Sequence, residues 1–292
     1  MSWLVEETRE PPNLRFGAKT REMPLTEYQK TVCRLLAAAR IARGEGYVAG
    51  GAAINELLAA PRVSHDVDVF HDSQSALLGA WESDRQLLTQ HGFTIQVLRE
   101  LPAFIEAAVT KDGEGVIFQW LQDSAYRFFP LVTHPDFGLV LHPFDLATNK
   151  ILALVGRVEI RDWVDIISCD RRLQPFGYLV WAASGKDLGL SPDFILAEAA
   201  RSARYTRDEV KTLAFAGTPP DFADLAAAWR RMLGDAGQII NRLPEDFIGC
   251  CVCVRDGGLF KGSVEELATA LGQDALVFHK GSFKGAWPQM EP

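Results

Sequence analysis

The chain lacks the features that would place it in a membrane or across the general surface of a nucleic acid. Its 292 residues contain no apolar run long enough to cross a bilayer, and residues 1–16 carry several acids and no apolar signal core. The formal net charge is −8, which argues against binding through a generally basic surface, though not against a local basic cleft. We therefore expect a cytoplasmic protein with no membrane partner.

The cysteines of the chain also lack the pattern of a disulfide framework or of a zinc site. The five cysteines are odd in number, which argues against a full disulfide framework. Cys250, Cys251 and Cys253 lie in an apolar run and have no second ligand pair at zinc spacing. We interpret them as small hydrophobic side chains in a buried strand. The chain also contains no Walker-type loop and no nucleophile motif, so a kinase-like phosphotransferase or a hydrolase is a poor interpretation.

The sequence does contain enough apolar material for a packed core. Hydrophobic residues make up 48% of the chain and charged residues 23%, and the length allows one large domain or two. The fold class expected is α/β, or α+β, with a small mixed sheet first and helices after it. We expect an N-terminal arm over 1–24, a core over 25–135, a helical domain over 136–245, and a C-terminal α/β extension and tail over 246–292.

Local signals place the elements of the core. Thr26 begins a capping box that opens a helix ending near Arg43, and Asp112-Gly113 is typical of a β-hairpin. The expected strands cover 47–49, 66–70, 93–98, 104–109 and 116–121, and two further helices cover 52–60 and 75–90.

The rest of the chain is predicted to be mainly helical. The expected helices cover 144–155, 160–171, 177–183, 192–204, 207–216 and 222–242. A β-α-β piece follows, with strands at 248–254 and 275–279 around a helix at 264–271, and the residues from about 281 are expected to form a tail.

Two carboxylates stand inside one short apolar strand. Side chains of a strand alternate between its faces, so Asp66 and Asp68 point the same way while Val67 and Val69 face the core. Two like charges at a half-buried position repel each other and resist desolvation, and a divalent cation between them removes that cost. The alternative is that both acids are simply solvated.

A glycine pair precedes these acids by one helix. Gly50-Gly51 directly follows a short apolar strand. Glycines at this place let an anion approach the backbone N–H groups and the N-terminus of the following helix closely. Alone, such a pair is a plain turn more often than a phosphate-binding site. The order of strand, Gly-Gly, helix and Asp-x-Asp strand favours a metal site beside a phosphate-binding turn.

Three cations recur later in the chain at helical spacing. At about 100° per residue, Lys150, Arg157 and Arg161 lie on one stripe, which favours an anionic ligand such as a nucleoside triphosphate. The alternative is a solvated face with Arg161 paired to Asp165. Gly156 would spoil the alignment if it ended the helix.

These motifs together resemble a known superfamily. Gly50-Gly51 followed by Arg-Val-Ser-His-Asp-Val-Asp from Arg62 to Asp68 resembles the Gly-Gly/Ser…Arg-x-Ser-x-Asp-x-Asp motif of the nucleotidyltransferase superfamily. Residues 145–165 are similar to the later motif of its AbiEii/AbiGii branch, which includes toxins of bacterial toxin–antitoxin and phage-exclusion systems. The resemblance covers roughly residues 45–170. It implies a polymerase-beta-like nucleotidyltransferase core followed by a helical domain.

The resemblance also implies roles for individual residues. Asp66 and Asp68 would bind Mg²⁺ or Mn²⁺, and Asp162 and Asp165 would orient the nearby cations or serve catalysis. The implied nucleotide-binding residues are Gly50, Gly51, Ser64, Lys150, Arg157 and Arg161. The implied catalytic residues are Asp66, Asp68, Asp123 and Asp162. The implied partners are a nucleoside triphosphate as substrate, a tRNA or protein acceptor, and an antitoxin protein.

The chain departs from the family pattern at two places. Many members have Gly-Ser where this chain has Gly50-Gly51, so a serine contact to phosphate is absent. Active members often carry a third carboxylate on a later strand, whereas Gln119 stands at the corresponding inward position here. Asp123, just beyond that strand, is a candidate substitute, although it also suits an ordinary turn.

Two hypotheses of function follow. The first is a Mg²⁺-dependent nucleotidyltransferase that moves a nucleoside monophosphate onto a hydroxyl of tRNA or protein, as a toxin of a toxin–antitoxin pair. The second is a catalytically weak nucleotide-binding or antitoxin-binding protein on the same fold. Basic residues of the helical part either receive an RNA acceptor or are solvated; they are Arg201, Arg204, Arg207, Lys211, Arg230 and Arg231.

Overall fold

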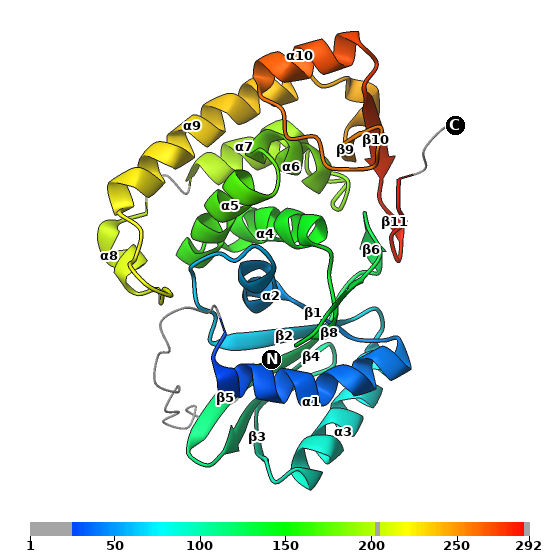
Figure 1. Ribbon diagram of the computed structural model, residues 1–292, viewed down its shortest axis with the longest axis vertical. Coiled ribbons are helices and arrows are strands. Elements are labelled where there is room, and N and C mark those ends of the chain that lie inside the picture. Colours follow the sequence, from blue (N-terminus) through cyan, green and yellow to red (C-terminus); the bar gives the residue numbers. More distant parts are fainter. Residues whose placement is uncertain (1–24, 202–204, 289–292) are drawn as a thin grey trace, which may run out of the picture. The chain divides into compact units, whose positions relative to one another are not determined.

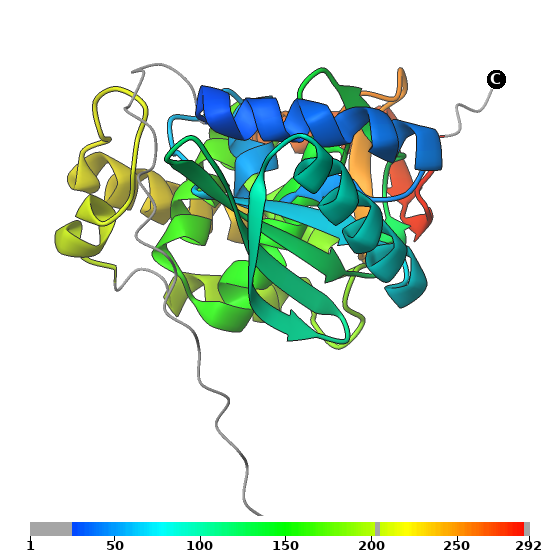
Figure 2. The same cartoon turned by 90° about the horizontal axis from the view of Figure 1, so that it is seen from below.

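The computed structural model describes residues 25–201 and 205–288, so the N-terminal arm expected over 1–24 lies outside the described part. The chain divides into two compact units. The first contains residues up to 53 together with 64–124 and 132–140, and the second contains 54–63, 125–131 and the residues from 141 onward. Figures 1 and 2 show their elements in two views.

The first unit is built on one seven-stranded mixed sheet, in the order β3-β4-β5-β2-β1-β8-β7. The strands are β1 Tyr47–Ala49, β2 Asp66–His71, β3 Thr94–Leu101, β4 Phe104–Lys111, β5 Glu114–Gln122, β7 Val132–His134 and β8 Gly138–Val140. Strands β2 and β5 run parallel, and so do β1 and β8, whereas the other neighbours run antiparallel. The expected small mixed sheet is therefore confirmed, with β7 and β8 as additional short strands.

Two long helices cover one face of this sheet (Figure 1). Helix α1 (Glu27–Arg43) begins with the capping box expected at Thr26, and helix α3 (Gln74–Gln90) begins at an N-cap serine, Ser73. The side chains beneath them are apolar: Val67 and Val69 of β2 are fully buried, and Trp120 of β5 stacks edge-on against Trp81 of α3 at 4.7 Å. The core of the first unit thus lies between these helices and the sheet.

Helix α2 (Gly50–Leu57) starts in the first unit and ends in the second. It begins directly after β1, two residues earlier than the sequence predicts. It ends before Ala59, whose φ of 48° is left-handed.

The second unit is mainly helical, as expected. Its helices are α4 Pro143–Arg157, α5 Ile160–Arg172, α6 Phe176–Ala183, α7 Pro192–Ala200, α8 Arg207–Lys211, α9 Phe222–Ile240 and α10 Val264–Gly272, with a short 3-10 turn, η2, at Glu245–Phe247. Every residue of α6 is buried, and this helix contacts α4, α5, α7 and α9. A helix that is apolar all round belongs at the centre of a helical group, and α6 has that place.

Two small two-stranded sheets complete the second unit. Strand β9 (Cys250–Val254) pairs antiparallel with β10 (Leu276–Lys280), with α10 between them in the chain, so the expected β-α-β piece is present. The three cysteines of β9 are buried, and the Sγ atoms of Cys251 and Cys253 lie 3.6 Å apart. Strand β11 (Ser282–Phe283) pairs with β6 (Tyr126–Arg127), so part of the expected tail is a strand.

One expected helix is much shorter than the sequence predicts. A helix was expected over 207–216, but α8 ends at Lys211. The backbone beyond it pairs elsewhere: Val63 N–H donates to Ala214 O at 2.9 Å, and Ala216 N–H donates to Pro61 O at 2.7 Å. These bonds compete with the helical ones and end the helix.

Over residues 25–201 and 205–288, none of the helices combines the length and the apolar character that a membrane span requires.

Candidate functional site

Asp66 and Asp68 project from the face of β2 opposite to the helices α1 and α3. Both are half-buried, whereas Val67 and Val69 between and after them have no exposed surface. Alternate residues of a strand are about 6–7 Å apart, so the two carboxylates stand side by side. The alternation expected from the sequence is confirmed, and the paired oxygens fit the hard ligands that Mg²⁺ takes.

Gly50 lies against Asp68. Ala49 pairs with Asp68 in the sheet, and Gly50 follows with a left-handed φ of 69°. A β-carbon on Gly50 would lie 1.7 Å from Oδ2 of Asp68, so any other residue there would displace this carboxylate as well as strain the backbone. Gly50 and Gly51 form the N-terminus of α2, where backbone N–H groups favour negative charge. The expected glycine turn and one metal-ligand candidate are therefore adjacent.

Ser64 holds the other carboxylate. Its hydroxyl donates to Oδ1 of Asp66 at 2.8 Å, and its carbonyl accepts a hydrogen bond of 3.0 Å from Nε2 of Gln29. Gln29 belongs to the capping box of α1. The first turn of α1 thus fixes Ser64, and Ser64 orients Asp66.

The face that carries Asp66 and Asp68 continues across the next two strands. Asp68 pairs with Gln119 of β5, and Gln119 pairs with Glu106 of β4. The Nε2 of Gln119 donates to Oε1 of Glu106 at 2.7 Å. Gln119 therefore has the inward position expected from the sequence.

Sequence reasoning missed Glu106, although a signal was present. Ile105 and Ala107, its neighbours in β4, are fully buried, so Glu106 is an acid in an otherwise apolar alternation. The same pattern identified Asp66 and Asp68. Which acids share a face across several strands becomes known only with the register of the sheet.

Asp123 is not brought to this group. Strands β2 and β5 run parallel, and Asp123 follows the partner of His71, four residues beyond the partner of Asp68. That offset corresponds to about 13 Å along the strand. Asp123 is exposed, and its Oδ1 accepts a hydrogen bond from the N–H of Ser124 at 2.7 Å. This geometry favours the ordinary turn that the sequence left open.

In the second unit, Lys150 lies between two buried aspartates. Its Nζ is 2.8 Å from Oδ1 of Asp162 and 3.0 Å from Oδ2 of Asp165. Burial alone would lower the pKa of Lys150, but the charges of Asp165 and Asp162 outweigh burial and hold it above its ordinary value. Lys150 is therefore charged at neutral pH.

Asp165 is held by a second cation as well. Arg62 donates to both carboxylate oxygens of Asp165, at 2.6 and 2.9 Å, and Asn55 Nδ2 donates to Oδ1 at 3.1 Å. Burial would raise the pKa of Asp165, yet Lys150 and Arg62 keep it below its ordinary value. The expectation that this acid orients nearby cations agrees with these contacts.

Arg157 and Arg161 do not share one helical stripe with Lys150. Helix α4 ends at Arg157, because Val158 takes a left-handed φ of 53°, and Arg161 belongs to the next helix, α5. Gly156 does not break α4. Arg157 donates to both oxygens of Asp162, at 2.7 and 3.0 Å, and Arg161 pairs with Glu159 at 2.6 Å. The single stripe predicted from helical periodicity is wrong.

Three cations and two aspartates lie together around Lys150, and Arg157 also lies 4.0 Å from a further acid, Glu159. Lys150, Arg62 and Arg157 face the two aspartates Asp162 and Asp165. Burial would raise the pKa of Asp162, but hydrogen bonds from Arg157 and the charge of Lys150 keep it low. The side chain of Arg157 is 44% exposed, so it is the cation of this group that a ligand in solution can reach.

Asp145, which opens the later family motif, has a structural place in the second unit. Its oxygens accept the N–H groups of Phe128 and Phe129 at 2.8 and 3.0 Å, and Nζ of Lys186 lies 2.8 Å from Oδ1. Asp145 thus anchors the segment around Phe128 to the start of α4.

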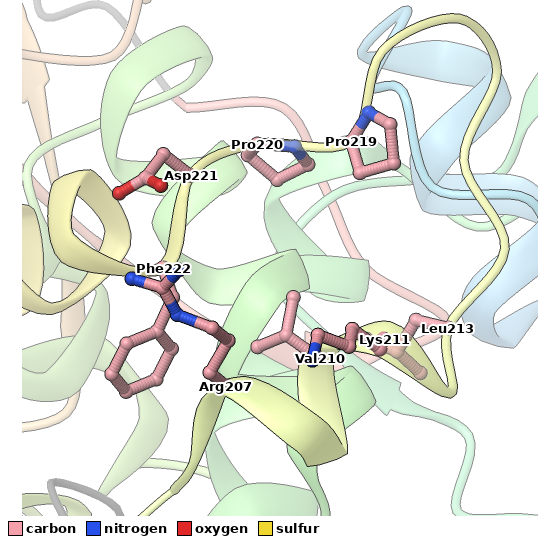
Figure 3. A pocket seen from close by; sticks show the side chains of 8 residues that line it. All are labelled: Arg207, Val210, Lys211, Leu213, Pro219, Pro220, Asp221 and Phe222. Atoms are coloured by element: carbon pink, nitrogen blue, oxygen red, sulfur yellow. The ribbon is translucent and has the colours of Figure 1, made fainter.

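A pocket of about 330 Å³ opens between α8 and the start of α9 (Figure 3). Its wall is apolar, with Val210, Pro219 and Phe222, and two of the basic residues noted above, Arg207 and Lys211, line it. Asp221 lines the pocket too, so two cations and one carboxylate face a volume that suits a small group with negative charge. Arg204, named with these cations from the sequence, lies outside the described residues.

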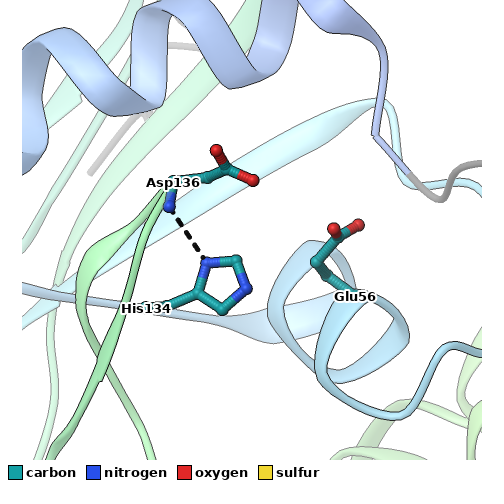
Figure 4. A group of neighbouring side chains, drawn as sticks. All are labelled: Glu56, His134 and Asp136. Atoms are coloured by element: carbon teal, nitrogen blue, oxygen red, sulfur yellow. Dashed lines mark hydrogen bonds between the residues drawn. The ribbon is translucent and has the colours of Figure 1, made fainter.

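His134 and Asp136 lie together at the end of β7 in the first unit (Figure 4). The N–H of Asp136 donates to Nδ1 of His134 at 3.2 Å, and Arg34 of α1 pairs with the Asp136 carboxylate at 2.5 Å. Asp136 therefore already has a cation. Glu56, drawn in the same view, belongs to the second unit, and we assign no site to the three.

The fold of this chain is a nucleotidyltransferase fold, as the resemblance implies. It is similar to that of MenT4, a nucleotidyltransferase toxin from Mycobacterium tuberculosis, with a TM-score of 0.50 and 17% identity over 75% of this chain and 85% of that one. JHP933 from Helicobacter pylori gives a TM-score of 0.45 and 16% identity over 75% of this chain and 95% of that one. The sequence matches no protein-family model and no curated protein.

Proposed function

We propose that this protein is a Mg²⁺-dependent nucleotidyltransferase. The oxygen of an acceptor hydroxyl forms a bond to the α-phosphorus of a nucleoside triphosphate, the bond from that phosphorus to pyrophosphate breaks, pyrophosphate leaves, and the hydroxyl proton passes to water. The observation that carries the proposal is the placement of Asp66 and Asp68 on one face, with Asp68 against Gly50 at the N-terminus of α2. Carboxylates beside an anion-binding helix N-terminus are what a metal–triphosphate complex requires.

The residues of the first unit have separate roles in this proposal. Asp66 and Asp68 hold the Mg²⁺, and Ser64 keeps Asp66 in one orientation through its 2.8 Å hydrogen bond. Gly50 and Gly51 receive the triphosphate oxygens on their backbone N–H groups. The metal, Mg²⁺ or Mn²⁺, supplies charge neutralisation at the reacting phosphate.

The residues of the second unit supply positive charge. We assign Lys150, Arg157 and Arg161 to phosphate binding, as the family motif implies. Arg157 is the best placed of these for a ligand, because its side chain is 44% exposed, against 36% for Arg161 and 8% for Lys150. Asp162 and Asp165 are then positioning residues, since Asp162 pairs with Lys150 and Arg157, and Asp165 pairs with Lys150 and Arg62.

The acceptor is proposed to be a hydroxyl of tRNA or of a protein, and the biological role that of a toxin controlled by an antitoxin. The support is the fold shared with MenT4, which is named as a nucleotidyltransferase toxin. Both substrates occur in the cytoplasm, where we propose that the protein works. The pocket beside Arg207 and Lys211 is a candidate for the acceptor end.

A second function is favoured by one observation, the amide at Gln119 where a third carboxylate is expected. A protein with a weak metal site would bind a nucleotide or an antitoxin and transfer little. This is the alternative to the transferase.

One pair of measurements separates the two. Purified protein is titrated calorimetrically with each nucleoside triphosphate and Mg²⁺, and incubated with α-labelled nucleotide and a tRNA or protein pool. The transferase predicts label on an acceptor, and Asp66→Asn should remove it without unfolding the protein. Asp123→Asn, an exposed carboxylate on the same unit, is the matched control and should keep activity. Binding without transfer would favour the second function, and transfer by Asp66→Asn at the normal rate would remove the catalytic assignment.

A further inference from the structure

Glu106 is an acid that neither the sequence motifs nor the proposed roles use. It lies on β4, two strands away from Asp68, with Gln119 of β5 between them in register. Laterally paired residues of neighbouring strands share a face and lie about 5 Å apart. The three side chains therefore form a row across the sheet, on the face of the proposed metal site.

The hydrogen bond between Gln119 and Glu106 fixes the orientation of the amide. An ionised carboxylate only accepts hydrogen bonds, so the group that Gln119 presents to Oε1 of Glu106, at 2.7 Å, is its NH₂. An amide oxygen in that place would meet a negative charge. The oxygen of Gln119 is thus the atom that this contact leaves available.

We propose that Glu106 is a positioning residue for the metal site and acts through Gln119. It holds the amide so that the oxygen of Gln119 serves as the additional oxygen ligand on the face of Asp66 and Asp68, in place of a third carboxylate. This inference rests on the proposed function, since it assumes that those two aspartates hold a divalent cation. A neutral amide oxygen is a hard ligand that Mg²⁺ and Mn²⁺ accept.

The burial of β4 supports a specific role for this acid. Glu106 is half-buried, and the residues on either side of it in the strand are completely buried. A carboxylate on a half-covered sheet face has a desolvation cost, which the charge-assisted hydrogen bond from Gln119 offsets. Glu106 is therefore held in a specific contact with Gln119 and is not simply solvated.

The test is a double-mutant cycle on metal affinity. Mn²⁺ binding is measured by calorimetry and by the loss of the free-ion EPR signal, for the intact chain, Glu106→Gln, Gln119→Ala and the double variant. We expect about tenfold weaker Mn²⁺ binding in each single variant, the loss typical of a charge-assisted hydrogen bond, and no further loss in the double variant. Glu114→Gln on β5 makes the same change at an exposed position of the hairpin and should leave affinity unchanged.

Each outcome decides one point. Unchanged affinity in Glu106→Gln, or losses that add in the double variant, would overturn the positioning role, because Glu106 would then not act through Gln119. Mn²⁺ binding that persists in Asp66→Asn would instead overturn the metal site and the proposed function with it. A protein that shows the expected cycle and yet transfers no nucleotide keeps the Glu106–Gln119 role and loses only the transferase activity. Far-ultraviolet circular dichroism of each variant shows that an altered affinity is not a folding defect.

Discussion

A β-carbon at residue 50 would lie 1.7 Å from Oδ2 of Asp68, so the carboxylate fills the space that any other residue would need. The left-handed φ of 69° at Gly50 makes the same demand independently. The position of the Asp68 carboxylate therefore explains why residue 50 is a glycine. This relationship links the turn and the proposed metal ligand as one structure.

Gly50→Ala should therefore weaken Mn²⁺ binding about tenfold or more and lower the free energy of unfolding by about 1–3 kcal/mol, the cost of a strained left-handed residue with a displaced neighbour. Calorimetry and urea unfolding measure the two effects. Gly79→Ala is the matched control: Gly79 lies in α3 with nothing within 4 Å of a new β-carbon, so that variant should gain about 1 kcal/mol and bind Mn²⁺ normally. If Gly50→Ala binds Mn²⁺ with normal affinity, the glycine turn is not part of the metal site.

Asp165→Asn should be strongly destabilising. The substitution leaves Arg62 and Lys150, which are nearly completely buried, with one carboxylate fewer, and breaking a buried pair in this way costs about 3 kcal/mol. Asp208→Asn breaks the pair between Asp208 and Lys211, both well exposed, and should leave the urea midpoint where it was. If both variants unfold at the same urea concentration, the group around Lys150 does not stabilise the second unit.

The elements with strong local signals could be predicted from the sequence. The capping box at Thr26 begins α1, and Asp112 and Gly113, both with positive φ, make the turn between β4 and β5. Strands β6, β7, β8 and β11 could not be predicted. Each has only two or three residues, too few for a period, and β11 pairs with β6 across more than half of the chain.

The candidate site divides in the same way. Alternation along β2 was enough to place Asp66 and Asp68, because side-chain direction in a strand is a local property. Glu106 and its bond to Gln119 depend on which strands are neighbours, and β2 and β5 are separated in the chain by α3, β3 and β4. The prediction that Lys150, Arg157 and Arg161 share one helical stripe is wrong because the helix ends before Val158. Its left-handed conformation cannot be read from the periodicity of the sequence.

Stability should fall as the pH is lowered from about 6.5 to about 4, because two histidines are buried in the neutral form. Burial lowers the pKa of His71 and of His142 to about 4. Between that value and the ordinary histidine pKa of about 6.5 the unfolded chain binds more protons than the folded one, so acid favours unfolding by at most about 3 kcal/mol for each histidine. Urea unfolding at half-unit pH steps measures the slope.

The structure explains why neither imidazole accepts a proton easily. Nδ1 of His71 donates to Leu121 O at 3.3 Å, while its Nε2 is buried without a hydrogen-bond partner; Nδ1 of His142 accepts the N–H of Phe144 at the start of α4. His142→Asn keeps an N-cap and should reduce the slope by about half. Ser191→Asn changes an N-cap without removing an imidazole, so the slope should stay the same. A full slope in His142→Asn would assign the acid sensitivity to other groups.

The pocket beside α8 gives the last prediction. If Arg207 and Lys211 contact the phosphates of an RNA acceptor, the variant Arg207→Ala/Lys211→Ala should raise the acceptor KM without changing the affinity for the nucleoside triphosphate. The slope of log affinity against log salt should fall by about 1.4, the value for two contacts to a single strand. Arg230→Ala/Arg231→Ala removes the same charge from exposed positions of α9 and should change neither quantity. If both double variants raise the acceptor KM equally, acceptor binding depends only on the total charge of the helical unit. If the KM is unchanged in Arg207→Ala/Lys211→Ala, the pocket has no part in acceptor binding.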